Sequence, residues 1–527
     1  MSFFLNYKMV KANELAKQQR EISISEFFAK NRHLLGFDNP SKALLTTIKE
    51  AVDNALDACE EAKILPDIFV EIKQVKEERY VAIIEDNGPG IVRAQVPKIF
   101  GKLLYGSKFH RLRMSRGQQG IGISAAAMYG QLTTGKGVNI TSKIGPNYAA
   151  HYFSLHIDTQ KNDPVITVDK EVDWSLKDHG TRIELELEAK YQKGKRGVSE
   201  YLRQTALANP HSKISYKGPE EQLVTYPRVI NELPKEAKEI KPHPYGVELG
   251  VLIKMLQSTK ASSLSGCLQS DFSRVSAKVA DEIITKAKLR AKSRPKTIAR
   301  KEAESLYEAI QKVKIIAPPT NCLSPIGEEG IIKSLKKEFD AEFFAACTRP
   351  PSVYRGNPFI IEAGIAYGGS IEKDGLATIM RFANKVPLLY QAGGCAVTKG
   401  ALDVAWRGYG LGQSKGALPQ GPLVIFVHIA SVWVPFTSES KEAVAHYPEI
   451  MKDIKLAIQE CGRKLGIHIR NVVRAREQKQ KAGLFEGYIR ELSNTLSELS
   501  GNEKGEIEEG LKHFLEKKLP LINGEKI

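Results

Sequence analysis

Four polar residues near the start of the 527-residue chain have types and spacing that suit chemistry on a phosphate. Glu50, Asp53, Asn54 and Asp57 would share one face of a helix predicted over residues 41–62. A carboxamide oxygen can hold Mg²⁺ together with phosphate oxygens, and a free carboxylate one turn away can deprotonate an attacking water. Taken alone, this pattern is more typical of the alternative, a solvated polar face on a surface helix.

A second motif follows an apolar strand predicted over residues 80–85. It runs Glu85-Asp86-Asn87-Gly88-Pro89-Gly90, so a carboxylate stands at the end of the strand, followed by two glycines. Aspartate in this position can accept a hydrogen bond from an exocyclic amine, and glycine lets the backbone approach a ligand closely. The alternative is a tight turn, because Asn-Gly and Pro-Gly are turn dipeptides.

A third motif is rich in glycine and precedes a run of alanines that predicts a helix. Glycines let backbone N–H groups converge on phosphate oxygens, and the start of a helix adds a partial positive charge. The spacing is not that of a P-loop, and no predicted strand leads into it, which argues against a dinucleotide-binding fold. A flexible loop is the alternative. The motif consists of Gly117, Gln118, Gln119, Gly120, Ile121, Gly122, Ile123 and Ser124.

Together the three motifs resemble the ATPase fold shared by gyrase B subunits, the ninety-kilodalton heat-shock chaperone, histidine kinases and mismatch-repair ATPases. The resemblance implies that Glu50 is the general base, Asn54 the Mg²⁺ ligand and Asp86 the acceptor for the adenine amino group. It also implies that Gly117–Ser124 forms a lid over the phosphates and that Thr181 lies near the adenine. A carboxylate at position 50 argues against histidine kinases. The ATP site would also include Asp57, Gly88 and Gly90.

Four further segments are similar to the B subunit of topoisomerase VI, the archaeal type IIB enzyme, and the likeness runs from about residue 25 to residue 464. This resemblance adds Ser107 and Lys108 to the ATP site. It also implies that Lys441 reaches the nucleotide from a transducer domain and senses the γ-phosphate. The four segments are residues 100–108, 241–246, 381–390 and 435–443.

The expected fold class is α+β and multidomain. The resemblance implies an ATPase domain over residues 1–228, with an N-terminal arm over residues 1–22, and a helix–two-turns–helix insert over residues 229–313. A transducer domain with a ribosomal-protein-like α/β fold is expected over residues 314–470. Prolines near both ends of the insert mark linkers, and the pattern between them is helical. Residues 471–527 predict a helical tail with an apolar stripe of Leu511, Phe514, Leu515 and Leu519.

The formal net charge of +16 and a pI near 9.3 suggest a polyanionic partner. Eight basic residues and no acid lie within residues 286–301, which favours contact with DNA over the alternative of a solvated helix face. Weaker basic candidates lie in a short loop and in a Trp406-Arg407-Gly408-Tyr409 motif whose aromatic residues could equally be core. The candidate DNA-binding residues are Lys286, Lys288, Arg290, Lys292, Lys195, Arg196 and Arg407.

The resemblance implies an ATP-operated gate in which two copies of the chain close around double-stranded DNA. No tyrosine has the setting of a cleavage nucleophile, so a separate A subunit is expected to cut the DNA in an A₂B₂ heterotetramer. ATP and Mg²⁺ are the expected cofactors. Two alternatives are a mismatch-repair-type ATPase and a DNA-binding scaffold that does not hydrolyse ATP.

Composition bounds where the protein works. No run of eighteen apolar residues exists, and the first twenty residues lack the apolar core of a signal peptide. The six cysteines are scattered without the C-x-x-C spacing of zinc sites. A cytoplasmic protein with no membrane association is therefore expected.

Overall fold

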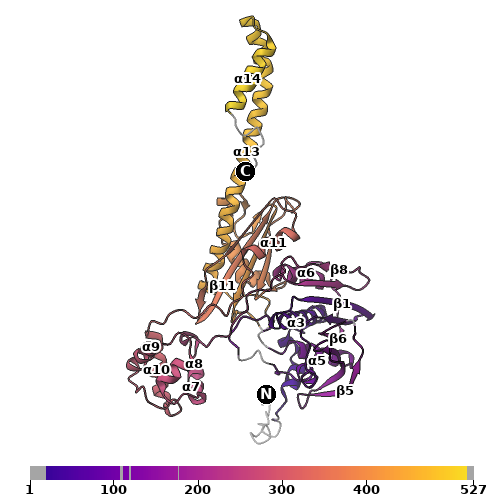
Figure 1. The fold of residues 1–527 in the computed structure, drawn as a ribbon, viewed down its shortest axis with the longest axis vertical. Helices are drawn as coiled ribbons and strands as arrows, with labels where there is room; N and C mark the ends of the chain where they lie inside the picture. Colours follow the sequence, from indigo (N-terminus) through magenta and orange to yellow (C-terminus); the bar gives the residue numbers. More distant parts are fainter. Residues whose placement is uncertain are drawn as a thin grey trace, which may run out of the picture.

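Three folded bodies and a long helical stalk make up the chain in a computed structural model (Figure 1). The structure describes residues 19, 21–106, 111–117, 120–175, 177–438 and 440–518. The ATP-site candidates Ser107, Lys108, Gln118 and Gln119 lie outside the described residues, as do Leu519 and most of the predicted N-terminal arm.

An eight-stranded sheet forms the first body, in the order β5-β4-β3-β6-β2-β1-β7-β8. Neighbouring strands are antiparallel except β1 and β7, which are parallel. The sequence predicts paired strands over residues 68–73 and 80–85, and the structure confirms them as the antiparallel pair β1 and β2. The strands are β1 Asp67–Lys76, β2 Arg79–Glu85, β3 Val138–Lys143, β4 Ala150–Asp158, β5 Asp163–Val172, β6 Gly180–Glu188, β7 Lys213–Lys217 and β8 Val224–Tyr226.

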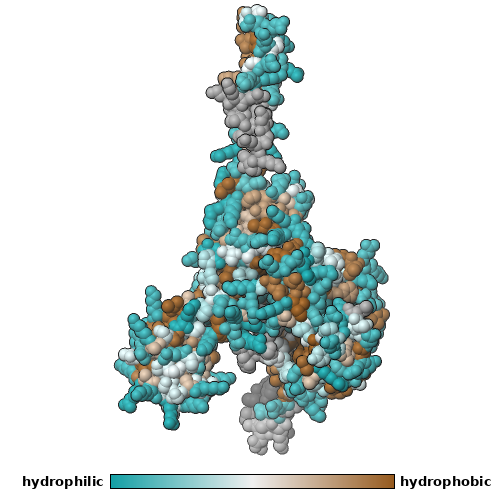
Figure 2. Space-filling view, viewed as in Figure 1, coloured by the Kyte–Doolittle hydropathy of each residue, from teal (hydrophilic) through white to brown (hydrophobic). Residues whose placement is uncertain are grey.

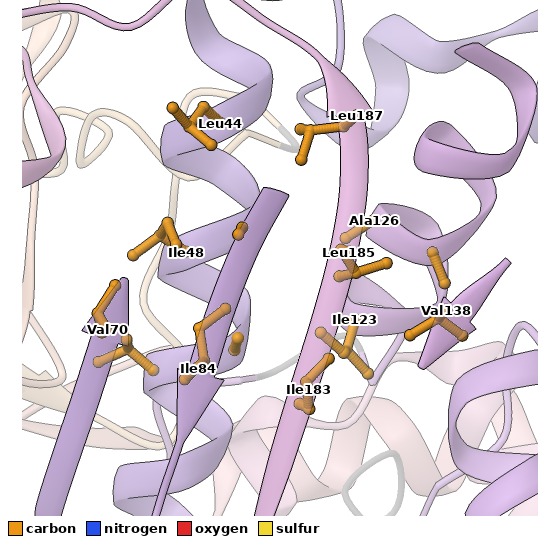
Figure 3. Close-up of a cluster of buried hydrophobic side chains, with 14 of the residues drawn as sticks. Leu44, Ile48, Val70, Ile84, Ile123, Ala126, Val138, Ile183, Leu185 and Leu187 are labelled. Atoms are coloured by element: carbon orange, nitrogen blue, oxygen red, sulfur yellow. The ribbon is translucent and has the colours of Figure 1, made fainter. Parts of the chain in front are cut away.

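Two helices, α3 (Pro40–Glu61) and α5 (Gly122–Thr134), pack on this sheet. Asn39 caps α3 by accepting from the Lys42 amide at 3.0 Å, and Pro40 fits the first turn because that turn leaves its amides unbonded. Figure 3 shows apolar side chains of both helices, such as Ile48 and Ala126, directed toward the strands. Burial of each large aliphatic side chain contributes roughly 1.5–3 kcal/mol. The smaller helices are α2 Ile24–Lys30, η1 Arg32–Leu35, η2 Arg93–Gln95, α4 Val96–Gly101 and α6 Val198–Ala208.

A small helical body follows, with its own buried apolar cluster. The sequence predicts a mainly helical pattern over residues 247–313, and the structure confirms it except over residues 287–299, which form a loop with one 3₁₀ turn. Lys288 adopts a left-handed φ of 56°, which a helix cannot accommodate, and Pro295 lacks the amide hydrogen that a helix needs. The elements are η3 Pro244–Gly246, α7 Leu249–Ser258, α8 Leu264–Asp271, α9 Ala277–Lys286, η4 Pro295–Thr297 and α10 Arg300–Lys312.

The third body is built on a six-stranded sheet that runs in the order β10-β11-β16-β12-β13, with β9 also paired to β11. The sequence predicts strands over residues 379–382 and 423–429, and the structure has them as β12 and β16, which are parallel neighbours. The elements are α11 Glu328–Glu338, β9 Phe343–Thr348, β10 Ser352–Tyr354, β11 Asn357–Tyr367, β12 Thr378–Ala383, β13 Val386–Pro387, η5 Ala392–Gly394, α12 Ala396–Leu402, η6 Trp406–Tyr409, β14 Gly412–Gln413, β15 Pro419–Gln420 and β16 Leu423–Ser431.

The stalk is the helix α13 (Pro448–Ser500), which begins on the third body and continues far beyond it (Figure 1). Helix α14 (Lys504–Lys518) turns back and packs against it. The helical prediction beyond residue 470 is thus confirmed for the described part of the tail, although α13 runs without a break across residue 470. Within the described ranges, no helix is both long and apolar enough to cross a membrane.

A buried carboxylate, Glu362 on β11, fixes the centre of the third body. It accepts hydrogen bonds from the amides of Ile326 and Gly327 at 2.8 and 2.7 Å, from the Thr348 hydroxyl at 3.0 Å and from His428 Nδ1 at 2.7 Å. Burial alone would raise the pKa of Glu362, but the hydrogen bonds that it accepts from His428 and from the two backbone amides lower it. Glu362 thus joins two strands to the start of α11.

We expect Glu362→Gln to destabilise the chain by about 2–4 kcal/mol, because an amide NH₂ would face donors where the carboxylate accepts. Chemical denaturation followed by circular dichroism measures the change. The control is Glu329→Gln, whose side chain is 79% exposed and should alter stability by less than about 0.5 kcal/mol. Equal effects of the two substitutions would contradict a structural role for the buried carboxylate.

Candidate functional site

Two adjoining cavities lie between α3, α5 and the ends of the central strands of the first sheet. The larger, about 220 Å³, is mostly apolar and contains Asp86 and Thr181. The smaller, about 180 Å³, contains Glu50, glycine backbone and Lys441. Asn54, Ile99 and Ile123 line both cavities. A single ligand with an apolar ring at one end and anionic groups at the other would fit across them.

Asp86 stands at the end of β2 and is 7% exposed. Its Oδ1 accepts from the Gly88 amide at 2.8 Å and from the Thr181 amide at 3.2 Å, so the second motif meets the start of β6 here. Gly180 permits this approach, because a Cβ at that position would lie 2.2 Å from the Asp86 carbonyl oxygen. Burial raises the pKa of Asp86 to about 6, against the lowering effect of the two amide hydrogen bonds.

Glu50 lies at the other end of the paired cavities, against the first turn of α5. A Cβ on Gly122 would come within 1.7 Å of Glu50 Oε2, so only glycine allows the helix to start against this carboxylate. The start of α5 also directs unbonded amides and partial positive charge toward the smaller cavity. Among the residues that the structure describes, none is hydrogen-bonded to the side chain of Glu50 or Asn54. Both groups are therefore available to a ligand.

Asn54 is suited to hold a magnesium ion that arrives with a phosphate chain. Its carboxamide lies at the junction of the two cavities, one helical turn from Glu50. Mg²⁺ prefers oxygen ligands and retains several waters, so one carboxamide oxygen plus phosphates is a sufficient protein contribution. The donor set of the cavities therefore fits the ion.

Lys441 comes from the third body yet lines the same cavity as Glu50. The sequence predicts that Ser438 or Ser440 caps a helix that continues through Ala445. This prediction is wrong, because the described residues around Lys441 form a loop closed by a bridge between Phe436 and Val444. Lys441 has a left-handed φ of 54°, and the Ala445 amide donates to the Pro435 carbonyl instead of to a helical partner. The loop therefore replaces the helix as the element that presents the lysine.

The ATP-site residues predicted from the sequence fall into three groups: those that line the cavities, those that lie beside them, and those outside the described residues. Most of them line one or both cavities. Gly88 contributes its amide to Asp86, Ile121 lines a neighbouring hollow with Glu50, and the Ser124 hydroxyl turns back to the Ile121 carbonyl at 3.1 Å. Those lining the cavities are Glu50, Asn54, Asp57, Asp86, Gly90, Gly117, Gly120, Gly122, Ile123, Thr181 and Lys441.

The polar face predicted for α3 is only partly open to a ligand. Asp53 is buried and accepts from the Tyr201 hydroxyl at 3.1 Å, and burial raises its pKa to about 7. Asp57 lines the larger cavity but pairs with Arg116 Nη1 at 2.7 Å. The alternative of a solvated face is therefore wrong, because both carboxylates are buried and have protein partners.

Arg116 is the main residue that the sequence motifs missed. It directly precedes the glycine motif, but its side chain turns back and bonds to Asp57, Glu60 and Asn209. Burial opposes its charge, yet the carboxylates of Glu60 and Asp57 raise its pKa. The sequence feature that could have identified Arg116 is its position directly before the glycine-rich motif. Apolar residues that line the cavities, such as Ile99, were also missed, because hydrophobic periodicity does not distinguish them from core residues.

The candidate DNA-binding residues lie outside both cavities and on separate surfaces. Those of the insert are all exposed on α9 and the loop after it, and Figure 2 shows a largely hydrophilic face there. Arg196 is exposed but lies over the Tyr390 ring at 5.8 Å. Trp406 is fully buried core, whereas Arg407 is exposed with its Nε bonded to the Gln413 carbonyl. The exposed members are Lys286, Lys288, Arg290, Lys292, Lys195, Arg196 and Arg407.

Comparison with known proteins finds one matching family for each of the two bodies that meet at the cavities. Residues 39–190 match the family of histidine kinase-, DNA gyrase B- and HSP90-like ATPases, and residues 318–481 match the transducer of the topoisomerase VI B subunit. The fold and the paired cavities thus define an ATPase of the gyrase B and HSP90 class.

Curated relatives narrow the class further. The B subunit of type 2 DNA topoisomerase 6 from Methanococcoides burtonii is 50% identical over 92% of this chain and 78% of that protein. The corresponding proteins of Methanosarcina mazei and Archaeoglobus fulgidus are 48% and 51% identical, over 97% and 86% of this chain and 80% and 75% of theirs. The chain belongs to the family of type 2 DNA topoisomerase 6 B subunits.

The raised pKa of Asp86 predicts that ATP affinity falls on acidification. Below about pH 6 the carboxyl is protonated and becomes a poorer acceptor for an adenine amine, so affinity should drop about tenfold between pH 8 and pH 5. Isothermal titration of a non-hydrolysable analogue measures it. Asp86→Asn is the control, because titration of the nucleotide itself affects both proteins equally. A ratio of affinities that does not change with pH would contradict the role of Asp86.

Proposed function

We propose that the chain binds and hydrolyses ATP as the clamp subunit of a type IIB DNA topoisomerase. The observation that carries this proposal is the meeting of Glu50, Asn54 and Lys441, from two folded bodies, around one cavity. A phosphate chain placed there would contact a water-activating carboxylate, a magnesium ligand and a cation from the transducer at once. Family membership supports the same conclusion.

Each of these residues has a distinct role in the proposed reaction. Glu50 accepts the proton of the attacking water, and Asn54 holds Mg²⁺, which neutralises phosphate charge. Asp86 accepts from the adenine amino group, and Thr181 orients Asp86 through its amide. Lys441, a compact charge with three donors, contacts the γ-phosphate and thereby reports hydrolysis to the transducer. Ser107, Lys108, Gln118 and Gln119 complete the proposed site.

Double-stranded DNA and a DNA-cleaving A subunit are the proposed partners. ATP would bring two copies of the chain together, with the N-terminal arm over residues 1–22 reaching its neighbour. Two A subunits would complete an A₂B₂ assembly, which is the symmetric arrangement expected for a gate. In this proposal the chain captures a duplex, and the A subunit opens the duplex through which it passes.

The stalk offers a surface for the A subunit. Helix α14 packs back on α13, but α13 leaves Leu484, Phe485 and Tyr488 more than half exposed. Apolar side chains grouped on an exposed helix are typical of a binding surface. We therefore place the partner's contact on residues 471–518, within the tail proposed from the sequence.

Glu50→Gln should retain ATP binding and lose hydrolysis by roughly 10²–10⁴-fold, because the amide cannot take a proton from water. Phosphate release measures turnover, and titration with a non-hydrolysable analogue measures binding. The substitution keeps the side-chain volume, so the contact with Gly122 should persist. Unchanged turnover would favour the scaffold that holds ATP as a structural ligand.

Neutralising the basic loop of the insert should weaken DNA binding by a similar factor for every sequence, because phosphate contacts carry little base information. The variant replaces Lys286, Lys288, Arg290 and Lys292 with glutamine. The slope of log affinity against log salt should decrease by roughly 0.9 for each lost contact.

A charge-matched control variant tests whether the position of these charges matters. It replaces four exposed lysines of the first body, Lys73, Lys76, Lys161 and Lys170, with glutamine. Fluorescence anisotropy over a salt series compares both variants with the unsubstituted chain. The same slope in all three proteins would mean that the insert loop is only a solvated surface.

A further inference from the structure

The segment that leads into the glycine loop is attached to the transducer and not to the ATPase sheet. Leu112 forms a β-bridge with Ile240, and the Met114 amide donates to the Cys322 carbonyl at 2.9 Å. The carbonyl of Ser115 accepts from Asn384 Nδ2 at 3.0 Å. Three successive backbone contacts therefore tie residues 112–115 to the linker and to the third body.

Met114 adds an apolar anchor to these hydrogen bonds. Its side chain is 8% exposed and belongs to a small cluster whose other buried members all lie in the third body or directly before it. Its sulfur also accepts from the Ser324 amide at 3.3 Å. The cluster is built from Met114, Cys322, Leu323, Ile360, Ala430 and Val432.

The side chain of Arg116 points the other way, toward the ATPase body. It bonds to Asp57 and Glu60 of α3, the helix that also carries Glu50 and Asn54. At the other end of the loop, Gly120 lines the phosphate cavity and Gly122 starts α5 in the ATPase body. The backbone of residues 112–115 is therefore held by the linker and the third body, whereas the side chains of Arg113 and Arg116 are held by α3 of the ATPase body.

The part of the transducer that contacts this segment is a tight turn. Asn384 and Lys385 join β12 to β13 with φ angles of 49° and 67°. The Asn384 side chain donates to the Ser431 carbonyl and accepts from the Ser431 amide, both at 2.9 Å. The Lys385 amide donates to His428 Nε2 at 2.9 Å, and Nδ1 of the same ring bonds to Glu362. The turn is thus joined by hydrogen bonds to the buried centre of the third body.

A cavity of about 360 Å³ lies beside this segment and leaves it room to shift. Residues 113–116 form one wall, and the linker near Pro234 and the turn at Lys385 form others. Close-packed interiors transmit strain, whereas a segment that borders a void of this size can change position without displacing core side chains. Residues 112–115 are therefore held by hydrogen bonds to the linker and the transducer, while one side of the segment borders a cavity.

We propose that residues 112–116 are a connector through which the transducer reads nucleotide occupancy independently of Lys441, with Met114 and Asn384 as its positioning residues. Lys441 contacts the nucleotide directly, whereas the connector responds to the backbone of Gly117 and Gly120 that lines the phosphate cavity. The connector rests on the proposed ATP site, because without a nucleotide there is nothing for it to report.

Hydrogen–deuterium exchange on the full chain, with and without a non-hydrolysable ATP analogue and Mg²⁺, tests the connector. We expect the analogue to change exchange at residues 112–117 and at residues 383–387 together, in the unsubstituted chain and in Lys441→Ala. In Met114→Ala combined with Asn384→Gly, analogue affinity should stay within about threefold while the response at residues 383–387 is lost. Glycine suits this test because position 384 has a positive φ.

Met114→Leu is the matched control, since it keeps the apolar volume of the anchor and should retain the response. A purely structural role would raise exchange equally with and without the analogue and leave the difference between the two states intact. An unaltered difference in the double variant would therefore overturn the connector, as would analogue binding without any response at residues 383–387 in the unsubstituted chain. Failure of the analogue to bind the unsubstituted chain would instead overturn the proposed ATP site.

Discussion

The cost of burying the charges of α3 is the constraint on which the rest of the structure depends. The helix carries Glu50 and Asn54 to the wall of the paired cavities, while the same face carries Asp53 and Asp57 into the interior and Glu60 to its edge. A buried carboxylate without a partner costs several kcal/mol, so each one needs a specific donor. Tyr201 supplies one for Asp53, and Arg116 supplies them for Asp57 and Glu60. Glu50 and Asn54 can line the cavities on this same helix because their acidic neighbours are satisfied.

Satisfying those charges also decides how the two domains meet. The guanidinium of Arg116 reaches Asn209, which in turn donates to the Lys385 carbonyl of the transducer turn at 3.2 Å. Burial lowers the pKa of Lys385, while the charge of Glu60 opposes that effect, so the acidic end of α3 also stabilises a transducer lysine. Removal of Arg116 would thus take one charged partner from Asp57 and from Glu60 and one donor from Asn209, which holds the transducer turn. The ATP site and the domain interface are in this sense one network.

The sequence predicts what depends on local pattern and misses what depends on packing between distant segments. Strand β2 and helix α3 follow from periodicity, whereas the grouping of Asp86 with Thr181 follows from the family resemblance, and the structure brings those two residues together. The helix expected after Pro435 follows equally sound local rules, but the bridge between Phe436 and Val444 overrides them. Likewise, nothing in the letters Arg-Met-Ser-Arg indicates that neighbouring residues face different domains. Such partners are chosen by tertiary contacts that leave no periodic signal.

The two proposed routes from the nucleotide to the transducer differ in the part of the ligand that each would detect. The proposed contact of Lys441 would exist only while the terminal phosphate is present. The segment over residues 112–116 would respond instead to whether the cavity is filled. The first is a direct electrostatic contact with the ligand, whereas the second is carried by backbone contacts of residues 112–115 with the linker and the third body. Since both end at the sheet that contains β12 and β16, filling the site and losing the phosphate can act on the transducer as separate events.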